Sequence, residues 1–237
     1  MPWIICGAFA VAALYLSIRD RRRVRTRNQE REAQRPLARE RLLAIPPLGA
    51  SRDDYYNVNI GMDGEFEIRS ESGMFTWAQP WCQPFRDLIA HPKLLPYMNS
   101  LFGRGWRLEG QPALIMARKG CGGHGLHGYT NREHDGTRYY AYANGQFRTG
   151  MTVIQYQLRD IEEGNGGVTV MSGSHKANFK CPEDIMLYNT DKEVVRNLAC
   201  KAGDLVIFMG ATIHGSLPWK ADYERRSLLY RYSPKHC

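Results

Sequence analysis

Histidines are the residues of this chain that point most directly to metal chemistry. There are seven of them: His91, His124, His127, His134, His175, His214 and His236. Imidazole is a common metal ligand, and a metal site needs two or three such side chains brought together by the fold. His127 and His214 are 87 residues apart. A β-barrel brings residues that are far apart in sequence close together when one is on an early strand and the other is on a late strand beside it. We therefore expect His127 and His214 to bind one metal ion.

The segments that must position these histidines resemble short strands separated by tight turns. β-branched, aromatic and apolar residues predict strands at 106–108, 113–117, 151–158, 168–171, 205–209 and 227–232. His127 follows a glycine-rich stretch, 120–128, that is typical of a loop. A periodic apolar segment over 85–102 predicts a helix interrupted at His91-Pro92, because proline disfavours helix in the preceding residue. The pattern predicts a mostly β jelly-roll barrel with flanking helices.

Several motifs accompany the two histidines between residues 85 and 234. They are 85–103 (FRDLIAHPKLLPYMNSLFG), Leu126-His127-Gly128, Leu158-Arg159-Asp160 leading through Gly164-Asn165-Gly166-Gly167 to Gly173-Ser174-His175-Lys176, and Ala202-Gly203-Asp204 onwards through His214 to Arg225. Together these stretches, roughly two-thirds of the chain, resemble the phytanoyl-CoA dioxygenase family of iron- and 2-oxoglutarate-dependent oxygenases.

The resemblance implies a double-stranded β-helix that binds Fe(II) and 2-oxoglutarate and uses molecular oxygen to hydroxylate a small organic or lipid-like substrate. His214 matches the family's second iron-binding histidine, and Arg225 matches the arginine that binds the distal carboxylate of 2-oxoglutarate. The planar guanidinium suits this role because it can bind a carboxylate through two hydrogen bonds. Ser216 could add a hydrogen bond to the co-substrate. His175 matches a structural segment of the family.

The sequence departs from the usual iron site at one point. That site contains two histidines and one carboxylate, with the signature His-x-Asp or His-x-Glu, because residues i and i+2 of an extended segment share a face. The signature is absent here, and Tyr129 stands two residues after His127. We expect Asp135 to be the third ligand, with Glu133 as its rival.

Three interpretations of this departure remain open. If Asp135 or Glu133 reaches the iron, the protein is an ordinary hydroxylase. If no carboxylate does, the vacant position can accept water or a halide, as in the related iron-dependent halogenases. The third alternative is a non-catalytic, membrane-associated binding module of the same fold, because fold alone does not establish activity.

Other polar and aromatic residues of the region allow both functional and structural roles. Tyr129, Tyr139, Tyr140 and Trp219 either shape a substrate pocket or pack the barrel. Asp160 and Asp204 lie beside predicted turns, where aspartate commonly accepts backbone hydrogen bonds, so we interpret both as structural.

The N-terminal part has a different composition from the rest. Residues 3–18 are uncharged and mostly apolar, and an arginine cluster follows directly. We expect a hydrophobic helix at 1–18 that serves as a membrane anchor, although the run is slightly short of the ~20 residues needed to cross a bilayer. Residues 19–50 would form a basic polar stalk, and 51–237 the catalytic domain. The positive flank places that domain on the cytosolic side; without an anchor the protein would be cytoplasmic.

Charge and cysteine content exclude other classes of protein. The formal net charge is +8, but residues 19–41 alone contain ten arginines against four acidic residues. The predicted catalytic domain is therefore nearly neutral, and we expect no nucleic-acid partner. The six cysteines contain no CxxC pair, so neither a zinc site nor a disulfide framework is indicated, and we expect reduced thiols.

Overall fold

The computed structural model describes residues 13–17, 64–65, 68–103, 105–128, 136–177 and 179–236. The chain divides into two compact units, one formed by Met1–Ser17 and Asn57–Cys237 and the other by Ile18–Tyr56. The second unit lies outside the described residues, and so does the whole of the predicted stalk, 19–50. The fold and the site below therefore belong to the first unit.

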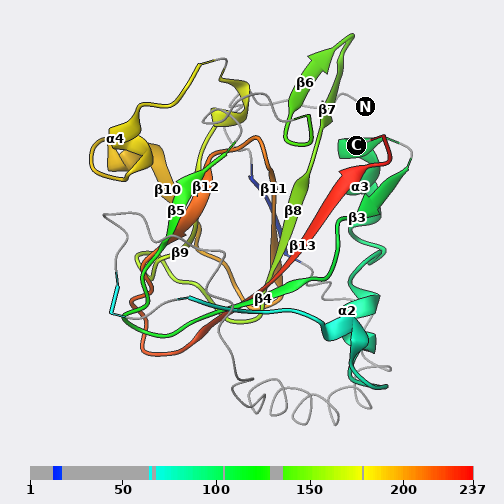
Figure 1. Ribbon diagram of the computed structural model, residues 1–237, viewed down its shortest axis with the longest axis horizontal. Helices are drawn as coiled ribbons and strands as arrows, with labels where there is room; N and C mark the ends of the chain where they lie inside the picture. Colours follow the sequence, from blue (N-terminus) through cyan, green and yellow to red (C-terminus); the bar gives the residue numbers. More distant parts are fainter. Residues whose placement is uncertain are drawn as a thin grey trace, which may run out of the picture. The chain divides into compact units, whose positions relative to one another are not determined.

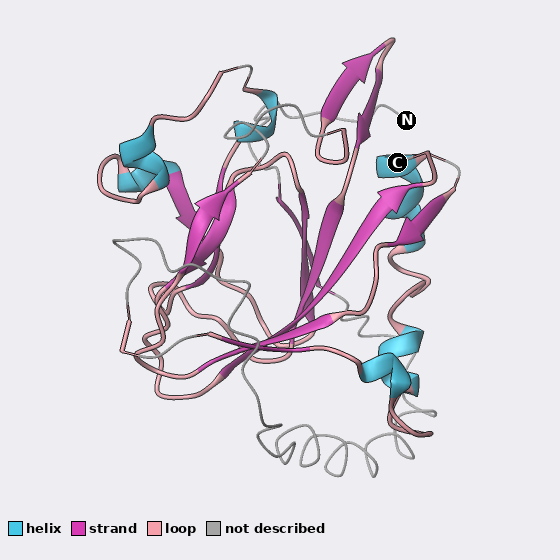
Figure 2. Ribbon diagram, in the orientation of Figure 1, coloured by secondary structure: helices cyan, strands magenta, loops and turns pink. Residues whose placement is uncertain are grey.

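Strands, most of them short, are the main regular secondary structure of the described chain, as Figure 2 shows. The strands are β1 (Ala13–Ser17), β2 (Arg69–Glu71), β3 (Trp106–Leu108), β4 (Ala113–Ala117), β5 (His124–His127), β6 (Tyr140–Ala143), β7 (Gln146–Thr149), β8 (Thr152–Gln157), β9 (Gly167–Met171), β10 (Val195–Asn197), β11 (Asp204–Met209), β12 (His214–Leu217) and β13 (Arg225–Pro234). The helices are α2 (Gln83–Asp87), α3 (Leu95–Phe102) and α4 (Glu183–Met186), with 3₁₀ turns η1 (Met74–Thr76), η3 (Ser174–Lys176) and η4 (Lys192–Val194). The prediction of a mostly β fold with flanking helices is confirmed.

The strands form two main antiparallel sheets and a separate hairpin (Figure 1). The larger sheet has the order β1-β11-β8-β13-β4-β2, with β3 paired to β13; the smaller has the order β10-β9-β12-β5; and β6 pairs with β7. Strands far apart in sequence are neighbours, since β4 pairs with β13 and β5 pairs with β12. This topology brings early and late segments together, as a jelly-roll barrel does.

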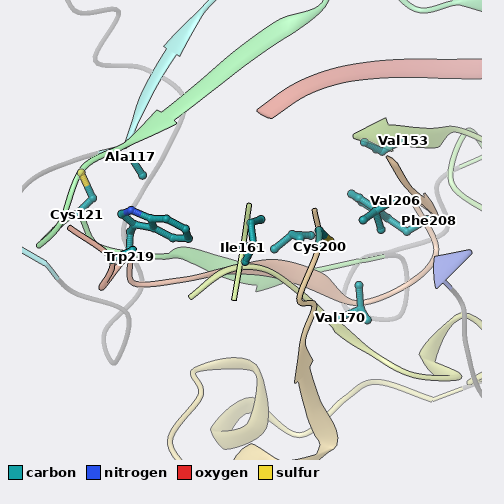
Figure 3. Close-up of a cluster of buried hydrophobic side chains, with 11 residues drawn as sticks. Ala117, Cys121, Val153, Ile161, Val170, Cys200, Val206, Phe208 and Trp219 are labelled. Atoms are coloured by element: carbon teal, nitrogen blue, oxygen red, sulfur yellow. The ribbon is translucent and has the colours of Figure 1, made fainter. Parts of the chain in front are cut away.

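A hydrophobic cluster fills the space between the two sheets (Figure 3). Its buried members are Ala117, Cys121, Val153, Ile161, Val168, Val170, Cys200, Val206, Phe208, Trp219 and Ala221. Side chains alternate between the faces of a strand. Because Val153 of β8 belongs to this cluster, Gln155 and Gln157 also face the interior, whereas Ile154 and Tyr156 face outward.

The outer face of the larger sheet is joined to the helical segment by three tyrosine hydroxyls. These donate to backbone carbonyls of the segment: Tyr156 to Leu88 (3.1 Å), Tyr230 to Phe85 (2.8 Å) and Tyr232 to Ile89 (2.9 Å). Buried tyrosine needs such a partner for its hydroxyl. The segment itself divides into α2 and α3 around His91-Pro92, which confirms the predicted interruption.

The apolar N-terminal run is described only at Ala13–Ser17, and there it is a strand. β1 pairs antiparallel with β11, with Ala13 opposite Phe208 and Ser17 opposite Asp204. The remainder of the predicted hydrophobic helix lies outside the described residues, so that helix stays a prediction. Within the described part of the chain, no helix is both long enough and apolar enough to span a bilayer.

Candidate metal and co-substrate site

His127 and His214 are direct cross-strand partners. His127 ends β5, His214 begins β12, and their Cα positions are opposite each other in the ladder. The ring centroids lie 4.2 Å apart. The sequence therefore predicted correctly that these two residues, 87 positions apart, converge.

Both rings are oriented by the same kind of backbone hydrogen bond. Nδ1 of His127 lies 2.8 Å from the carbonyl oxygen of Gly125, and Nδ1 of His214 lies 2.7 Å from that of Thr212. A carbonyl oxygen only accepts, so each Nδ1 must carry the hydrogen. In the neutral ring the lone pair is then on Nε2, the state in which a histidine binds a metal ion.

The surroundings of His214 favour its neutral form. Burial lowers the pKa of His214 well below its usual value, and the neighbouring His127 lowers it further. The Phe208 ring packs against it with a centroid distance of 4.5 Å. A neutral imidazole is the metal-binding form, so this ring needs no deprotonation before it can coordinate.

Arg225 introduces a buried positive charge into the same interior. Only 2% of its surface is exposed, and its Nη1 donates to Ser216 Oγ at 3.2 Å. Its Nε is buried and has no hydrogen-bond partner among the described residues. Burial lowers the pKa of Arg225 to about 10, and no described carboxylate offsets this effect. A buried guanidinium in this state fits an anionic ligand, which would provide the missing acceptors.

Comparison with protein families identifies the chain. The profile of the phytanoyl-CoA dioxygenase family matches residues 38–227, more than half of the sequence. The chain belongs to the phytanoyl-CoA dioxygenase family. The members of this family are non-haem iron enzymes that depend on 2-oxoglutarate. No curated protein sequence matches the chain.

Several solved structures have the same fold. HygX from Streptomyces hygroscopicus, with nickel and 2-oxoglutarate bound, has a TM-score of 0.71 and 16% identity over 95% of this chain and 84% of its own. AviO1 from Streptomyces viridochromogenes Tue57 has a TM-score of 0.55 and 20% identity over 86% and 84%. The carbocyclase SnoK from nogalamycin biosynthesis has a TM-score of 0.55 and 14% identity over 94% and 80%. These similarities confirm the predicted fold.

The residues present fit the cofactors of the family. His214 and Ser216 lie two residues apart on β12 and therefore on one face, about 6.6 Å apart along the strand. This separation places a metal-binding nitrogen near one end of a short dicarboxylate and the Ser216–Arg225 pair near the other. The unpartnered Nε of Arg225 is the observation that favours an anion at that second end.

The third metal ligand predicted from the sequence is not tested. Asp135 and Glu133 lie outside the described residues, as does Tyr129. Among the residues that the structure does describe, no three His, Cys, Asp or Glu side chains form a group that could hold a metal ion. The described part of the site is thus a histidine pair with an arginine and a serine, and Asp135 stays a prediction.

His124 is a residue of the site that the sequence did not reveal. It stands three positions before His127 in β5, an odd spacing that normally puts two side chains on opposite faces. The β5–β12 ladder shifts register here, because His214 is opposite His127 whereas Ser216 is opposite His124. The extra residue in β5 is a β-bulge, and the two rings pack at 4.6 Å. Burial, and secondly His127, lowers the pKa of His124 to about 4.

The remaining candidates have structural contacts. Trp219 is 1% exposed within the core cluster and donates its Nε1 hydrogen to the carbonyl of Tyr223, so for this residue the packing interpretation is right. Tyr139 lies within hydrogen-bond distance of His236, and Tyr140 packs against the ring of His175 at 4.7 Å. The ring contact with Tyr140 places His175 beside the β6–β7 hairpin.

The two aspartates have the turn contacts that the sequence predicted. Asp204 accepts the backbone N–H of Lys201 at 2.7 Å, and Asp160 accepts that of Ala202 at 2.7 Å. Both carboxylates fix the turn that leads into β11, so their interpretation as structural residues agrees with the contacts found.

Proposed function

We propose that this protein is an Fe(II)- and 2-oxoglutarate-dependent oxygenase that hydroxylates a small organic or lipid-like substrate. His127 and His214 would hold the iron, and Arg225 with Ser216 would hold the distal carboxylate of 2-oxoglutarate. The observation that carries this proposal is the arrangement along β12. His214, with its Nε2 lone pair available, lies two residues from Ser216, which accepts a hydrogen bond from the buried guanidinium of Arg225, and Nε of that guanidinium has no partner among the described residues.

The side chains of this chain act by binding and orienting. The carbonyls of Gly125 and Thr212 hold the two imidazoles in one tautomer and one orientation. Arg225 neutralises the distal carboxylate in a water-poor interior, where a charge-assisted hydrogen bond is strong. When bound, iron and 2-oxoglutarate supply the oxidising chemistry, in which oxygen is consumed, the 2-oxo acid becomes succinate and carbon dioxide, and a substrate C–H bond is hydroxylated.

The hydroxylase also requires an oxygen donor beside the histidine pair, and we assign this role to Asp135, with Glu133 as the rival. Iron(II) in such a site takes two histidines and one carboxylate. Asp135→Ala should abolish 2-oxoglutarate turnover if Asp135 is the ligand, while Glu133→Ala should leave it intact. The reverse result would assign Glu133 instead.

Anaerobic loading with Fe(II) and 2-oxoglutarate, followed by oxygen and measurement of succinate, tests the proposed function. We expect succinate to form in wild type and to be lost in His214→Gln. If calorimetry detects no binding of 2-oxoglutarate to the metal-loaded protein, both enzyme interpretations are wrong, and the non-catalytic module replaces them.

A halogenase-type enzyme is the alternative within the same chemistry. Its distinguishing property would be a halide bound at the position that a carboxylate otherwise occupies. Turnover that continues in a Glu133→Ala/Asp135→Ala double variant, together with a chloride-dependent change in the spectrum of the iron, would favour the halogenase. Loss of turnover in that variant without any chloride effect would favour the hydroxylase.

Membrane attachment is a separate proposal. It is supported by the apolar residues 3–18 and by the arginines that follow them. The alternative is that the segment belongs to the folded domain, since Ala13–Ser17 pairs with β11 as a strand of the larger sheet. Liposome flotation of the full chain and of a variant that lacks residues 1–18 distinguishes an anchor from a strand of the sheet. If the segment is an anchor, the full chain should float with the liposomes and the shortened chain should sediment.

A further inference from the structure

Gln157, at the end of β8, is a buried polar residue that the roles described above do not use. Its exposed fraction is 0%, and its side chain faces the barrel interior on the same side of β8 as Val153. Buried side chains are usually apolar, as Val153 is, and a buried polar side chain needs hydrogen-bond partners. A fully buried amide at this point therefore calls for an explanation.

One half of the Gln157 amide is fixed by a neighbouring strand. Ser227 of β13 is its direct cross-strand partner, and Ser227 Oγ donates to Gln157 Oε1 at 2.7 Å. The other half, Nε2, is buried and has no hydrogen-bond partner in the described structure. Because the serine holds the carbonyl side of the amide, the NH₂ group has a defined direction and an unused donor.

Gln157 lies close to Arg225 through this serine. Arg225 stands two residues before Ser227 on β13, so both side chains are on the same face of the strand. Diagonal neighbours of this kind lie within reach of long side chains such as glutamine and arginine. Two buried nitrogens without a partner, Gln157 Nε2 and Arg225 Nε, thus belong to the same region of the interior.

Donors without acceptors point to an acceptor that is supplied from outside the chain. A carboxylate can accept several hydrogen bonds at once, from a guanidinium and from an amide. Both nitrogens would be satisfied by one carboxylate, and the positive charge would be compensated at the same time. A neutral or cationic ligand would leave the guanidinium uncompensated.

We propose that Gln157, held in place by Ser227, is a further binding residue for the distal carboxylate of the 2-oxo acid. This inference rests on the proposed function, because it assumes that a 2-oxo dicarboxylate occupies the site. It assigns Gln157 a part in selectivity, since its donor favours 2-oxo acids with a second carboxylate over those without one.

Calorimetry with the full chain loaded with Ni(II), which binds without turnover, tests this proposal. The ligands are 2-oxoglutarate and pyruvate, a 2-oxo acid that lacks the distal carboxylate. In Gln157→Met the Kd for 2-oxoglutarate should rise about 10- to 100-fold, as expected for loss of one hydrogen bond to a charged group. The Kd for pyruvate should stay as in wild type.

Two further variants support the interpretation. Thr152 is another fully buried polar residue of β8, but its side chain is on the outward face of the strand and its hydroxyl donates to the carbonyl of Gly150. Thr152→Val should therefore leave the affinities for 2-oxoglutarate and pyruvate unchanged. Ser227→Ala keeps the amide but removes the group that orients it, so it should weaken 2-oxoglutarate selectively and less strongly. If Gln157→Met does not fold, as judged by thermal unfolding, Ser227→Ala decides the question.

The outcomes separate this proposal from the proposed function. If Gln157→Met binds 2-oxoglutarate as tightly as wild type, Gln157 is not a binding residue, although the oxygenase proposal stands. If both ligands weaken equally, Gln157 acts through the metal site or the fold, and the selectivity role is wrong. If wild type binds neither ligand, both proposals are wrong. Ser227→Ala with unchanged affinities also contradicts the role of the serine-held amide.

Discussion

His127 and His214 face each other across β5 and β12, and each donates its Nδ1 hydrogen to the backbone carbonyl two residues earlier in the chain. Gly125 lies within β5 and Thr212 lies in the turn that leads into β12, so backbone held by the sheet and its turn orients both rings. Such outer hydrogen bonds set the tautomer and direction of a metal ligand before the metal arrives. The pair is prepared for a metal ion at the junction of an early and a late strand.

Replacement of either histidine should remove metal binding without unfolding the chain. In His127→Gln and in His214→Gln we expect the affinity for Ni(II) to fall at least about 100-fold, since even losing an outer partner of a ligand costs 10- to 100-fold. His91→Gln is the matched control, because His91 lies outside the barrel and accepts a hydrogen bond from the Lys93 backbone. Calorimetric titration with Ni(II) measures the effect. Equal binding by all three variants would exclude the histidine pair as the metal site.

Replacement of Arg225 should weaken co-substrate binding without lowering the stability of the ligand-free protein. In Arg225→Met we expect the affinity for 2-oxoglutarate to fall about 100-fold, because a charged, fork-shaped donor is lost. The ligand-free variant should unfold at the same or a higher temperature than wild type, since an uncompensated buried charge is replaced by an apolar chain of similar length. Calorimetry and thermal unfolding measure the two quantities. A large loss of stability would show that Arg225 is a structural residue.

The sequence predicted the regular part of the fold well, for reasons that particular strands make clear. β3 and β4 have the predicted bounds, 106–108 and 113–117, and β8, β9, β11 and β13 differ by a few residues. These strands are apolar and β-branched, so the signal is local. The sequence analysis did not predict β5, whose histidines and glycine carry no strand signal. It also missed the β6–β7 hairpin, although Asn144-Gly145, both with positive φ, is a typical hairpin turn between two segments that contain aromatic residues.

The site was predictable only where motifs surround a residue. His214 and Arg225 stand in such motifs, and the structure places both in the interior. His124 joins His127 through a bulge that depends on the register with β12, which a single sequence does not contain. The unused amide of Gln157 depends on Ser227, 70 residues away in sequence. Asp135 and Glu133 remain predictions.

The buried thiols should be unreactive in the native protein. Cys82, Cys121, Cys181 and Cys200 are buried thiols. Burial raises the pKa of Cys121 and Cys181, and it raises the pKa of Cys200 to about 12. The thiolate is the reactive form, so raising the pH from 8 to 9 should not activate these groups.

A disulfide reagent that reports released thiolate measures this reactivity. In a Cys6→Ser/Cys237→Ser variant, which lacks the two cysteines outside the described residues, the native protein should react slowly at both pH values. In urea the four described cysteines should react at once. Rapid reaction of the folded variant at pH 8 would contradict the burial of these four side chains.

Gly167 should be required for the position of the Arg225 guanidinium. A Cβ at residue 167 would lie 3.2 Å from Nε of Arg225 and 3.3 Å from its Cδ, so the arginine would have to move. In Gly167→Ala we expect the Kd for 2-oxoglutarate to rise about tenfold, equivalent to about 1.4 kcal/mol, while Ni(II) affinity stays unchanged. Because φ of Gly167 is +79°, the variant should also lose about 1–2 kcal/mol of stability.

Gly164→Ala separates the two effects. Gly164 has a similar φ of +82°, but a Cβ there meets no atom within 4 Å, so this variant has the backbone strain without the contact to Arg225. It should lose about the same stability, ~1–2 kcal/mol, and keep the wild-type Kd for 2-oxoglutarate. If both variants weaken 2-oxoglutarate equally, the loss comes from the strained turn and not from the arginine. If only Gly167→Ala loses affinity for 2-oxoglutarate, the absence of a side chain at residue 167 is required for the position of the Arg225 guanidinium.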